Sequence, residues 1–177
     1  LIIDTRSADA FAECHPAGAL HVSLDGQFAS WVGTVVRPDQ DIVLVADAGR
    51  IEEAVVRLAR VGYERVVGVL DGDLDRWRSE GHPTGAVHRL PPESWPDGGR
   101  RVLDVRRARE WNDFHIDGAT HIPLAELPER LAELDRGAEW VVVCAGGYRS
   151  GIAVSLLQRA GFGAVANGVG GMDGWRK

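Results

Sequence analysis

The chemistry of this chain centres on a cysteine at the start of a short loop. Cys144 follows the apolar run Trp140 to Val143 and opens the sequence Cys-Ala-Gly-Gly-Tyr-Arg-Ser, residues 144–150. Glycines let a backbone curl so that successive N–H groups point inward, and a helix that starts behind the loop adds its own unpaired N–H groups. Such a loop is a cradle for an anion. Cysteines beside an arginine and a helix start ionise more readily than a free thiol, so we predict a nucleophilic thiolate at Cys144.

The other candidate site residues adjoin this cysteine in the sequence or close the chain. Arg149 is the candidate contact for an anionic substrate because of its planar, permanent charge. The alternative for Arg149 is a salt bridge that fixes the loop, since Arg50 occupies the same place in a similar loop without cysteine. Ser150 is predicted to cap a helix, with its hydroxyl near the sulfur. The prediction takes Cys144 as the catalytic residue and the following as substrate-binding residues: Ala145, Gly146, Gly147, Tyr148, Arg149, Ser150 and Trp175.

The chain repeats itself. Residues 1–24 align with residues 101–124 at a constant spacing of 100, which pairs Asp4 with Asp104 and His15 with His115. Around the two loops the spacing becomes 99, and near the ends of the repeats it becomes 98. Such self-similarity indicates two homologous units. They join near residues 80–92, where glycine and prolines interrupt regular structure. We therefore expect one domain at residues 1–85 and a second at residues 86–177.

Short valine-rich runs alternate with helical patterns in each unit. The runs are typical of buried strands, and they cover residues 1–4, 42–46, 65–70, 102–105, 140–144 and 164–169. Residues 50–61 and 150–160 place apolar side chains at helical spacing and stop at Gly62 and Gly161. The alternation predicts an α/β fold with a largely parallel sheet and helices on both faces. Ligands bind such sheets at the carboxyl ends of strands, where Cys144 falls.

Composition limits the possible functions. The chain has 177 residues, of which 45% are apolar, and a net charge of -6, which fits a soluble globular protein. Its scattered arginines argue against a nucleic-acid partner. No apolar run is long enough to span a bilayer, so no membrane partner is predicted. No signal-peptide pattern opens the chain, and we therefore expect a cytoplasmic protein. The two cysteines lack zinc-site spacing, and the histidines that recur in both units are explained by the shared fold. No metal or cofactor is predicted.

Two chemistries use a cysteine loop that ends in arginine, and loop length separates them. In cysteine phosphatases and the related arsenate reductases, the loop typically has five residues between the cysteine and the arginine. Here only four residues lie between Cys144 and Arg149. The shorter ring suits a terminal group smaller than a phosphate, so a phosphatase or arsenate reductase is the alternative enzyme.

Taken together, both copies resemble the rhodanese family of sulfurtransferases. The resemblance lies in the Asp-x-Arg strand ends, the turns at 15–24 and 115–124, the loop at 144–149 and the closing residues 170–175. It implies two tandem rhodanese-like domains, each a small, mostly parallel sheet flanked by helices. It also implies that Cys144 takes a sulfane sulfur from a small sulfur-containing donor such as thiosulfate or a persulfide. The sulfur is then held as a persulfide and passed to a thiol or cyanide.

The first domain is expected to be catalytically inactive, because Val45 occupies the position of Cys144. Its loop carries Asp47 in place of Gly146, and Glu52 and Glu53 fall in the first turn of the next helix. Carboxylates are favourable neighbours for the N–H groups at a helix start. We therefore expect the protein's own acids to occupy or shield this cradle.

The resemblance also extends to a class of fusion proteins. Residues 144–157 are similar to the rhodanese tails of proteins whose front half has a metallo-β-lactamase fold. The chain opens on a strand pattern without an initiator methionine, so we expect a truncated first domain and a covalently fused upstream domain of that fold. A non-catalytic sulfur-relay or interaction module of such a fusion is the remaining alternative.

Overall fold

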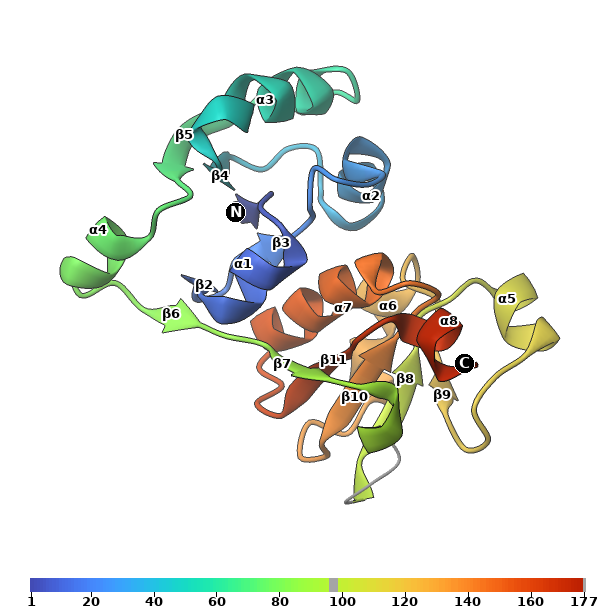
Figure 1. The fold of residues 1–177 in the computed structure, drawn as a ribbon. Helices are drawn as coiled ribbons and strands as arrows, with labels where there is room; N and C mark the ends of the chain where they lie inside the picture. The colour runs from blue at the N-terminus through green and yellow to red at the C-terminus, as the bar shows by residue number, and fades with distance from the viewer. Residues whose placement is uncertain (96–98, 177) are drawn as a thin grey trace. The chain divides into compact units, whose positions relative to one another are not determined.

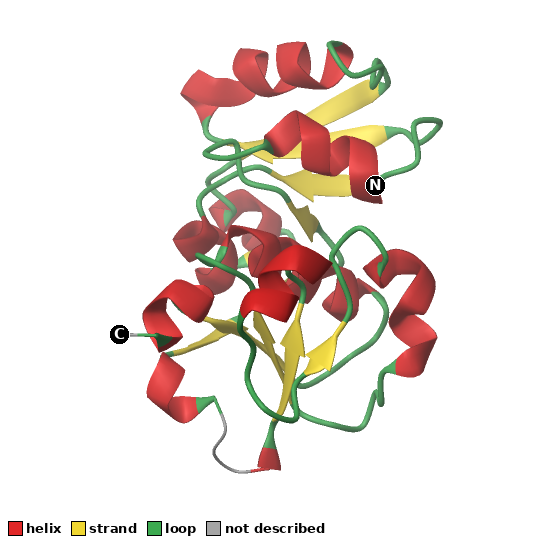
Figure 2. Cartoon of the chain, turned by 90° about the vertical axis from the view of Figure 1, so that its right-hand side faces the viewer, coloured by secondary structure: helices red, strands yellow, loops and turns green. Residues whose placement is uncertain are grey.

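The computed structural model describes residues 1–95 and 99–176. The chain divides into two compact units, Leu1–Ala86 and Val87–Lys177. Each has its own parallel sheet (Figure 1). The predicted fold class is confirmed: the protein is an α/β chain of two similar domains with parallel sheets flanked by helices, and the helices and strands of each can be followed in Figure 2.

The first unit has a four-stranded parallel sheet in the order β3-β1-β4-β5 and a small antiparallel pair, β2-β6. Its strands are β1 (Ile2–Asp4), β2 (His15–Pro16), β3 (Leu20–His21), β4 (Ile42–Ala46), β5 (Val66–Asp71) and β6 (Thr84–Gly85). Its helices are α1 (Ala8–Glu13), α2 (Phe28–Val35), the 3₁₀ turn η1 (Ala48–Arg50), α3 (Ile51–Ala59) and α4 (Asp75–Ser79).

The second unit has a five-stranded parallel sheet in the order β7-β11-β10-β8-β9. Its strands are β7 (His88–Leu90), β8 (Arg101–Asp104), β9 (Thr120–His121), β10 (Trp140–Val143) and β11 (Val165–Gly168). Its helices are η2 (Pro92–Ser94), α5 (Ala108–Asp113), α6 (Leu127–Arg130), η4 (Leu131–Glu133), α7 (Tyr148–Arg159) and α8 (Gly171–Trp175).

The strand that leads to the cysteine is the central strand of its sheet. All four residues of β10 are buried, because neighbouring strands cover both of its edges and side chains cover both of its faces. One face packs into a core made of Trp95, Val102, Val141, Val143 and Met172. Helix α7 packs against β10 and β11. Cys144 is therefore delivered by the most enclosed strand of the unit.

The helix ends follow the sequence prediction, whereas one helix start does not. Gly62 and Gly161 adopt positive φ angles of 88° and 86° just beyond α3 and α7, a conformation that glycine tolerates best. The predicted helix at residues 150–160 begins two residues earlier, at Tyr148. This shift moves Ser150 from the predicted cap position into the first turn.

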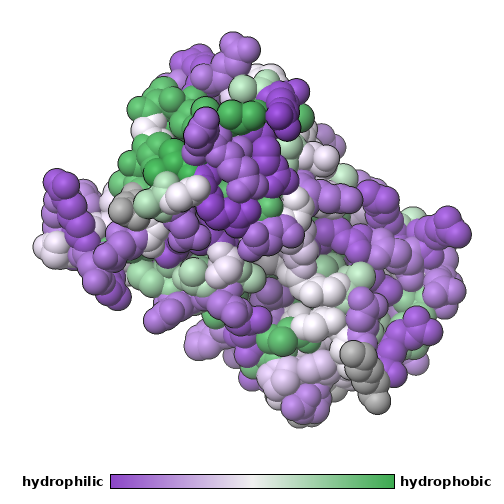
Figure 3. Space-filling model, turned by 45° about the horizontal axis from the view of Figure 1, so that its top comes forward, coloured by the Kyte–Doolittle hydropathy of each residue, from purple (hydrophilic) through white to green (hydrophobic). Residues whose placement is uncertain are grey.

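The exposed apolar side chains gather in the first unit. Val56, Val61, Val67 and Val69 are each more than two fifths exposed, and Val67 reaches 63%. The space-filling view shows hydrophobic patches among a mostly hydrophilic surface (Figure 3). Strand β5, which carries Val67 and Val69, lies at the edge of its sheet, whereas β11 of the second unit is paired on both sides. None of the helices in residues 1–95 and 99–176 is long and apolar enough to cross a membrane.

Candidate active site

The sulfur of Cys144 is enclosed by its own loop. Cys144 is only 1% exposed. The backbone N–H of Gly147 donates a hydrogen bond to its Sγ atom over 3.1 Å. The hydroxyl oxygen of Ser150 lies 3.5 Å from Sγ, while that hydroxyl donates to the carbonyl of Gly147 over 3.0 Å. Residues 144–150, here called the cysteine loop, therefore enclose the sulfur. The Gly147 N–H is the donor that suits a thiolate, whereas the Ser150 hydroxyl gives its proton to the Gly147 carbonyl and turns its oxygen toward the sulfur.

One glycine lets the loop close in this way. Gly147 is the N-cap of α7 and adopts a φ of 105°, in the left-handed region that side chains with a Cβ disfavour. A Cβ built there would meet nothing within 4 Å. The requirement for glycine is thus conformational rather than steric. It aims the Gly147 N–H back at the sulfur.

Helix α8 holds the cysteine loop from the other side. The backbone N–H of Met172 donates to the carbonyl of Cys144 over 2.7 Å, and that of Asp173 donates to the carbonyl of Ala145 over 3.0 Å. Gly171 makes this approach possible, because a Cβ there would lie 2.2 Å from the oxygen of Ala145. The first carbonyls of the loop are therefore fixed by backbone contacts.

Arg149 forms the salt bridge that the sequence left as the alternative to a substrate contact. Its two terminal nitrogens each donate to a carboxylate oxygen of Glu110, both over 2.6 Å. The side chains are 16% and 33% exposed. The hydrogen bonds from Arg149 lower the pKa of Glu110 to about 2, and the same pair raises the pKa of Arg149. The end of the loop is thus clamped by a charged bidentate contact.

The sequence prediction missed Glu110. It lies in α5, and its carboxylate also accepts the backbone N–H of Arg107 over 3.1 Å. Ala10 stands at the corresponding position of the first unit. The signal that could have identified Glu110 is that the carboxylate occurs only in the unit that has the cysteine.

The residues common to both units serve the fold in both. Asp104 and Arg106 form a buried ion pair of 2.6 Å, as do Asp4 and Arg6. Both arginines also donate to a backbone carbonyl at the end of the next helix. The shared histidines stack on an aromatic ring, which is Phe11 in the first unit and Trp111 in the second.

Tyr148 and Trp175 differ in how they relate to the loop. Tyr148 is the first residue of α7 and lies within the cysteine loop. Trp175 stacks on Trp95 with ring centroids 5.4 Å apart, and it lines a hollow with Pro92 and Glu93. Packing accounts for the position of Trp175, and its role toward a substrate stays a prediction.

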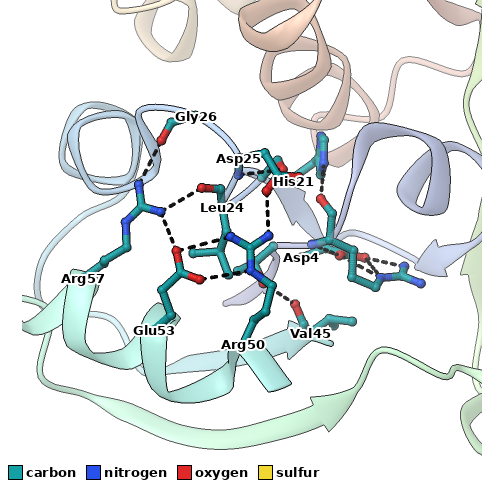
Figure 4. Close-up of polar contacts among 12 residues, drawn as sticks. Asp4, His21, Leu24, Asp25, Gly26, Val45, Arg50, Glu53 and Arg57 are labelled. Carbon is teal, nitrogen blue, oxygen red and sulfur yellow. Dashed lines mark hydrogen bonds and ion pairs between the residues drawn. The ribbon is translucent and has the colours of Figure 1, made fainter. Parts of the chain in front are cut away.

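The corresponding loop of the first unit, residues 45–51, has a different shape. Val45 takes the place of Cys144, and the chain then enters the 3₁₀ turn η1. Arg50 contacts Asp25 over 2.6 Å and Glu53 over 3.0 Å (Figure 4). Asp47 is exposed and makes no capping hydrogen bond with its side chain. Asp47 therefore does not cap this turn, and Glu53 binds Arg50 instead. That the acids of this loop shield it from an anionic donor stays a prediction.

The chain belongs to the rhodanese family. The model of the rhodanese-like domain matches residues 1–80 and again residues 92–177. The fold, the repeat and the cysteine loop are thus features of one family of domains, present twice.

Named relatives include sulfur-handling proteins. The putative sulfur carrier protein YrkF of Bacillus subtilis is 39% identical over 79 residues, which are 45% of this chain and 43% of the relative. The probable adenylyltransferase/sulfurtransferase MoeZ of Mycobacterium tuberculosis is 33% identical over 121 residues, which are 66% of this chain and 30% of the relative. The chain thus spans less than half the length of either protein.

Two further matches are to proteins named thiosulfate sulfurtransferases. GlpE of Stutzerimonas stutzeri is 31% identical over 91 residues, half of this chain and 84% of the relative. The crystal structure of the thiosulfate sulfurtransferase from Pseudomonas aeruginosa is 29% identical, with a TM-score of 0.44, over 99% of this chain and 38% of that one. The chain is thus similar to a protein named a thiosulfate sulfurtransferase over half of its length.

Proposed function

We propose that the second unit is a sulfurtransferase that carries a sulfane sulfur on Cys144. The observation that carries this proposal is the hydrogen bond from the Gly147 N–H to the cysteine sulfur. It is made possible by a left-handed glycine at the start of α7. A backbone donor aimed at sulfur stabilises a thiolate and a persulfide anion alike.

The reaction has two displacement steps. The thiolate of Cys144 attacks the outer sulfur of the donor, the donor's S–S or S–sulfonate bond breaks, and the electron pair leaves with a thiolate or sulfite. An acceptor thiolate or cyanide then attacks the outer sulfur of the Cys144 persulfide, which returns the Cys144 thiolate. No external oxidant is needed, since the sulfur keeps its oxidation level throughout. This is ping-pong covalent catalysis.

The loop residues have distinct roles in this proposal. Ala145, Gly146 and Gly147 shape the backbone around the sulfur, and Ser150 adds a hydroxyl 3.5 Å from it. Tyr148, the first residue of α7, is proposed to border the bound sulfur. Arg149 positions the loop through its contact with Glu110. The first unit, which lacks the thiol and the left-handed turn, is proposed to be catalytically inactive.

A turnover assay tests the proposal against its alternative enzyme class. Purified protein is given thiosulfate or a persulfide with cyanide or a thiol as acceptor, and an aryl phosphate in a separate reaction. The account expects sulfur transfer that vanishes in Cys144→Ser, and phosphate hydrolysis equal in both proteins. Cysteine-dependent phosphate release without sulfur transfer would move the assignment to a phosphatase.

The position of these domains in a larger protein stays a prediction. The resemblance of residues 144–157 to fusion tails motivates an upstream metallo-β-lactamase-fold domain, for which the second unit would act as a sulfur-relay partner. Reading the residues encoded before Leu1 tests it. Finding another kind of domain there would remove the fusion hypothesis and leave the sulfurtransferase proposal intact.

A further inference from the structure

An acidic side chain lies beside the exposed side of the cysteine loop. Asp173 is exposed, and its Oδ2 atom is 3.9 Å from where a Cβ on Gly146 would lie. Gly146 is the exposed residue of the loop. The backbone bond from Asp173 to Ala145 fixes the start of α8 against the loop. The backbone of Asp173 is therefore held beside the exposed side of the cysteine loop.

The arginine of the cysteine loop does not offset this charge. Arg149 is the cation of the cysteine loop, and both of its terminal nitrogens are bound to Glu110. The buried Arg106 is likewise paired with Asp104. No ion pair to Asp173 is found in the described parts of the chain, residues 1–95 and 99–176. An anionic donor that approaches Gly146 is therefore repelled by the carboxylate of Asp173. The arginine of the loop does not compensate for this repulsion, because it is already paired with Glu110.

We propose that Asp173 is a specificity-determining residue that selects against dianionic donors, so that the donor is a persulfide of low charge rather than thiosulfate. This inference rests on the proposed function. In the step, the Cys144 thiolate attacks the outer sulfur of the neutral form R–S–S–H. A new S–S bond forms on Cys144, the donor's S–S bond breaks, and the electron pair leaves as the thiolate R–S⁻. Electrons and protons balance without a further reagent.

A series of donors with graded charge provides the test. Wild-type and Asp173→Asn proteins are compared with the persulfide of 2-mercaptoethanol, whose carrier is neutral, the persulfide of mercaptosuccinate, which adds two carboxylates, and thiosulfate. Asp173→Asn is expected to raise kcat/KM about fivefold for the two dianionic donors, which is about 1 kcal/mol. The change should lie mainly in KM and shrink at high salt, since an exposed carboxylate is screened. The neutral donor should be unaffected.

Two further variants separate charge from structure. Asp173→Glu keeps the charge and should keep the wild-type discrimination. Glu139→Gln removes another exposed carboxylate, one that pairs with Arg100 just before β10 begins, at the opposite end of that strand from Cys144. It should leave kcat/KM for every donor unchanged. A persulfidated neutral peptide, run beside the small persulfide, distinguishes a protein persulfide from a small-molecule persulfide as donor by which one reacts faster, and Asp173→Asn should leave both rates unchanged.

The outcomes also distinguish a failure of this inference from a failure of the proposed sulfurtransferase function on which it rests. If Asp173→Asn alters all three donors by the same factor, or none, the specificity role of Asp173 is overturned while sulfur transfer stands. If no donor loads or turns over on the wild-type protein, the proposed function itself fails.

Discussion

The two loops follow equivalent strands in equivalent sheets, yet only one of them curls around the atom at its start. In the second unit Gly147 takes a φ of 105° and directs its N–H to Sγ. In the first unit Ala48 stands at that position and opens a 3₁₀ turn, and the described residues with positive φ are all glycines. The comparison teaches that the cradle depends on one glycine as much as on the cysteine.

The arginines that end the two loops show a second difference. Arg149 is clamped by Glu110 from a separate helix, α5. Arg50 is instead held partly by Glu53, from the helix that follows its own loop. Because Ala10 replaces Glu110 in the first unit, that unit cannot make the same clamp. The loop of the first unit therefore lacks the nucleophile, the left-handed turn and the clamp.

The largest expected effect comes from trying to restore the first loop with a thiol alone. Val45→Cys in a Cys144→Ser background is predicted to give no sulfur transfer above the Cys144→Ser protein. The reason is that Ala48 in a 3₁₀ turn stands where Gly147 turns its N–H toward the sulfur in the second unit. A turnover assay with a persulfide donor measures it. Clear activity in the double variant would show that the first loop lacks only its cysteine.

The second test breaks the turn rather than the thiol. Gly147→Ala forces a left-handed φ on a residue with a Cβ, which costs roughly 1–2 kcal/mol. If that cost falls on the sulfur-binding conformation, kcat/KM should drop about tenfold. Gly49→Ala is the matched control in the first-unit loop, since Gly49 has no positive φ and open space for a Cβ. Equal activities of Gly147→Ala and wild type would remove the turn from the account.

The sequence predicted the architecture well because strands and helices here have clear local patterns. The run from Trp140 to Val143 is apolar throughout and is a buried central strand. Two of the differences from the prediction involve geometry that periodicity does not encode. A hydroxyl before an apolar run predicts a helix cap at Ser150, whereas in the structure the left-handed Gly147 caps the helix. Glu110 was missed because it meets Arg149 only after folding.

The third test removes the clamp. Glu110→Gln should lower the free energy of unfolding by about 1 kcal/mol, a value reduced because a third of the side chain is exposed and water screens the pair. A kinetic assay should show a several-fold loss of kcat. Glu53→Gln, which loosens Arg50 in the first unit, should leave sulfur transfer unchanged. Identical kinetics for Glu110→Gln and wild type would show that the clamp does not position the loop.

The same pair predicts a pH dependence of stability. The pKa of Glu110 is depressed from its ordinary value of 4.5 to about 2 in the folded protein. The contribution of the Glu110 carboxylate to the free energy of unfolding is therefore fully present above about pH 5. It is lost as the pH falls from 4.5 toward 2. Denaturant unfolding of wild type and Glu110→Gln should differ at pH 7 and converge near pH 2. A difference that stays constant down to pH 2 would contradict the assigned pKa.

The smallest effect is expected at the aromatic residues that close the two units. Trp175→Phe weakens the stack on Trp95 and should cost about 0.5–1.5 kcal/mol of stability, with kcat/KM within twofold of wild type. Trp77→Phe is the counterpart in the first unit, where Trp77 contacts His82. A large loss of donor affinity in Trp175→Phe with unchanged stability would instead place this ring in the substrate pocket.

The central claim is that Cys144, and not the other thiol, receives the sulfur. Intact-mass measurement and peptide mapping after incubation with a persulfide donor test it directly, because the chain has only two cysteines, both free. The account predicts one added sulfur per chain, on the peptide that contains Cys144, and none after Cys144→Ser. Sulfur on Cys14 instead, or on neither peptide, would contradict it.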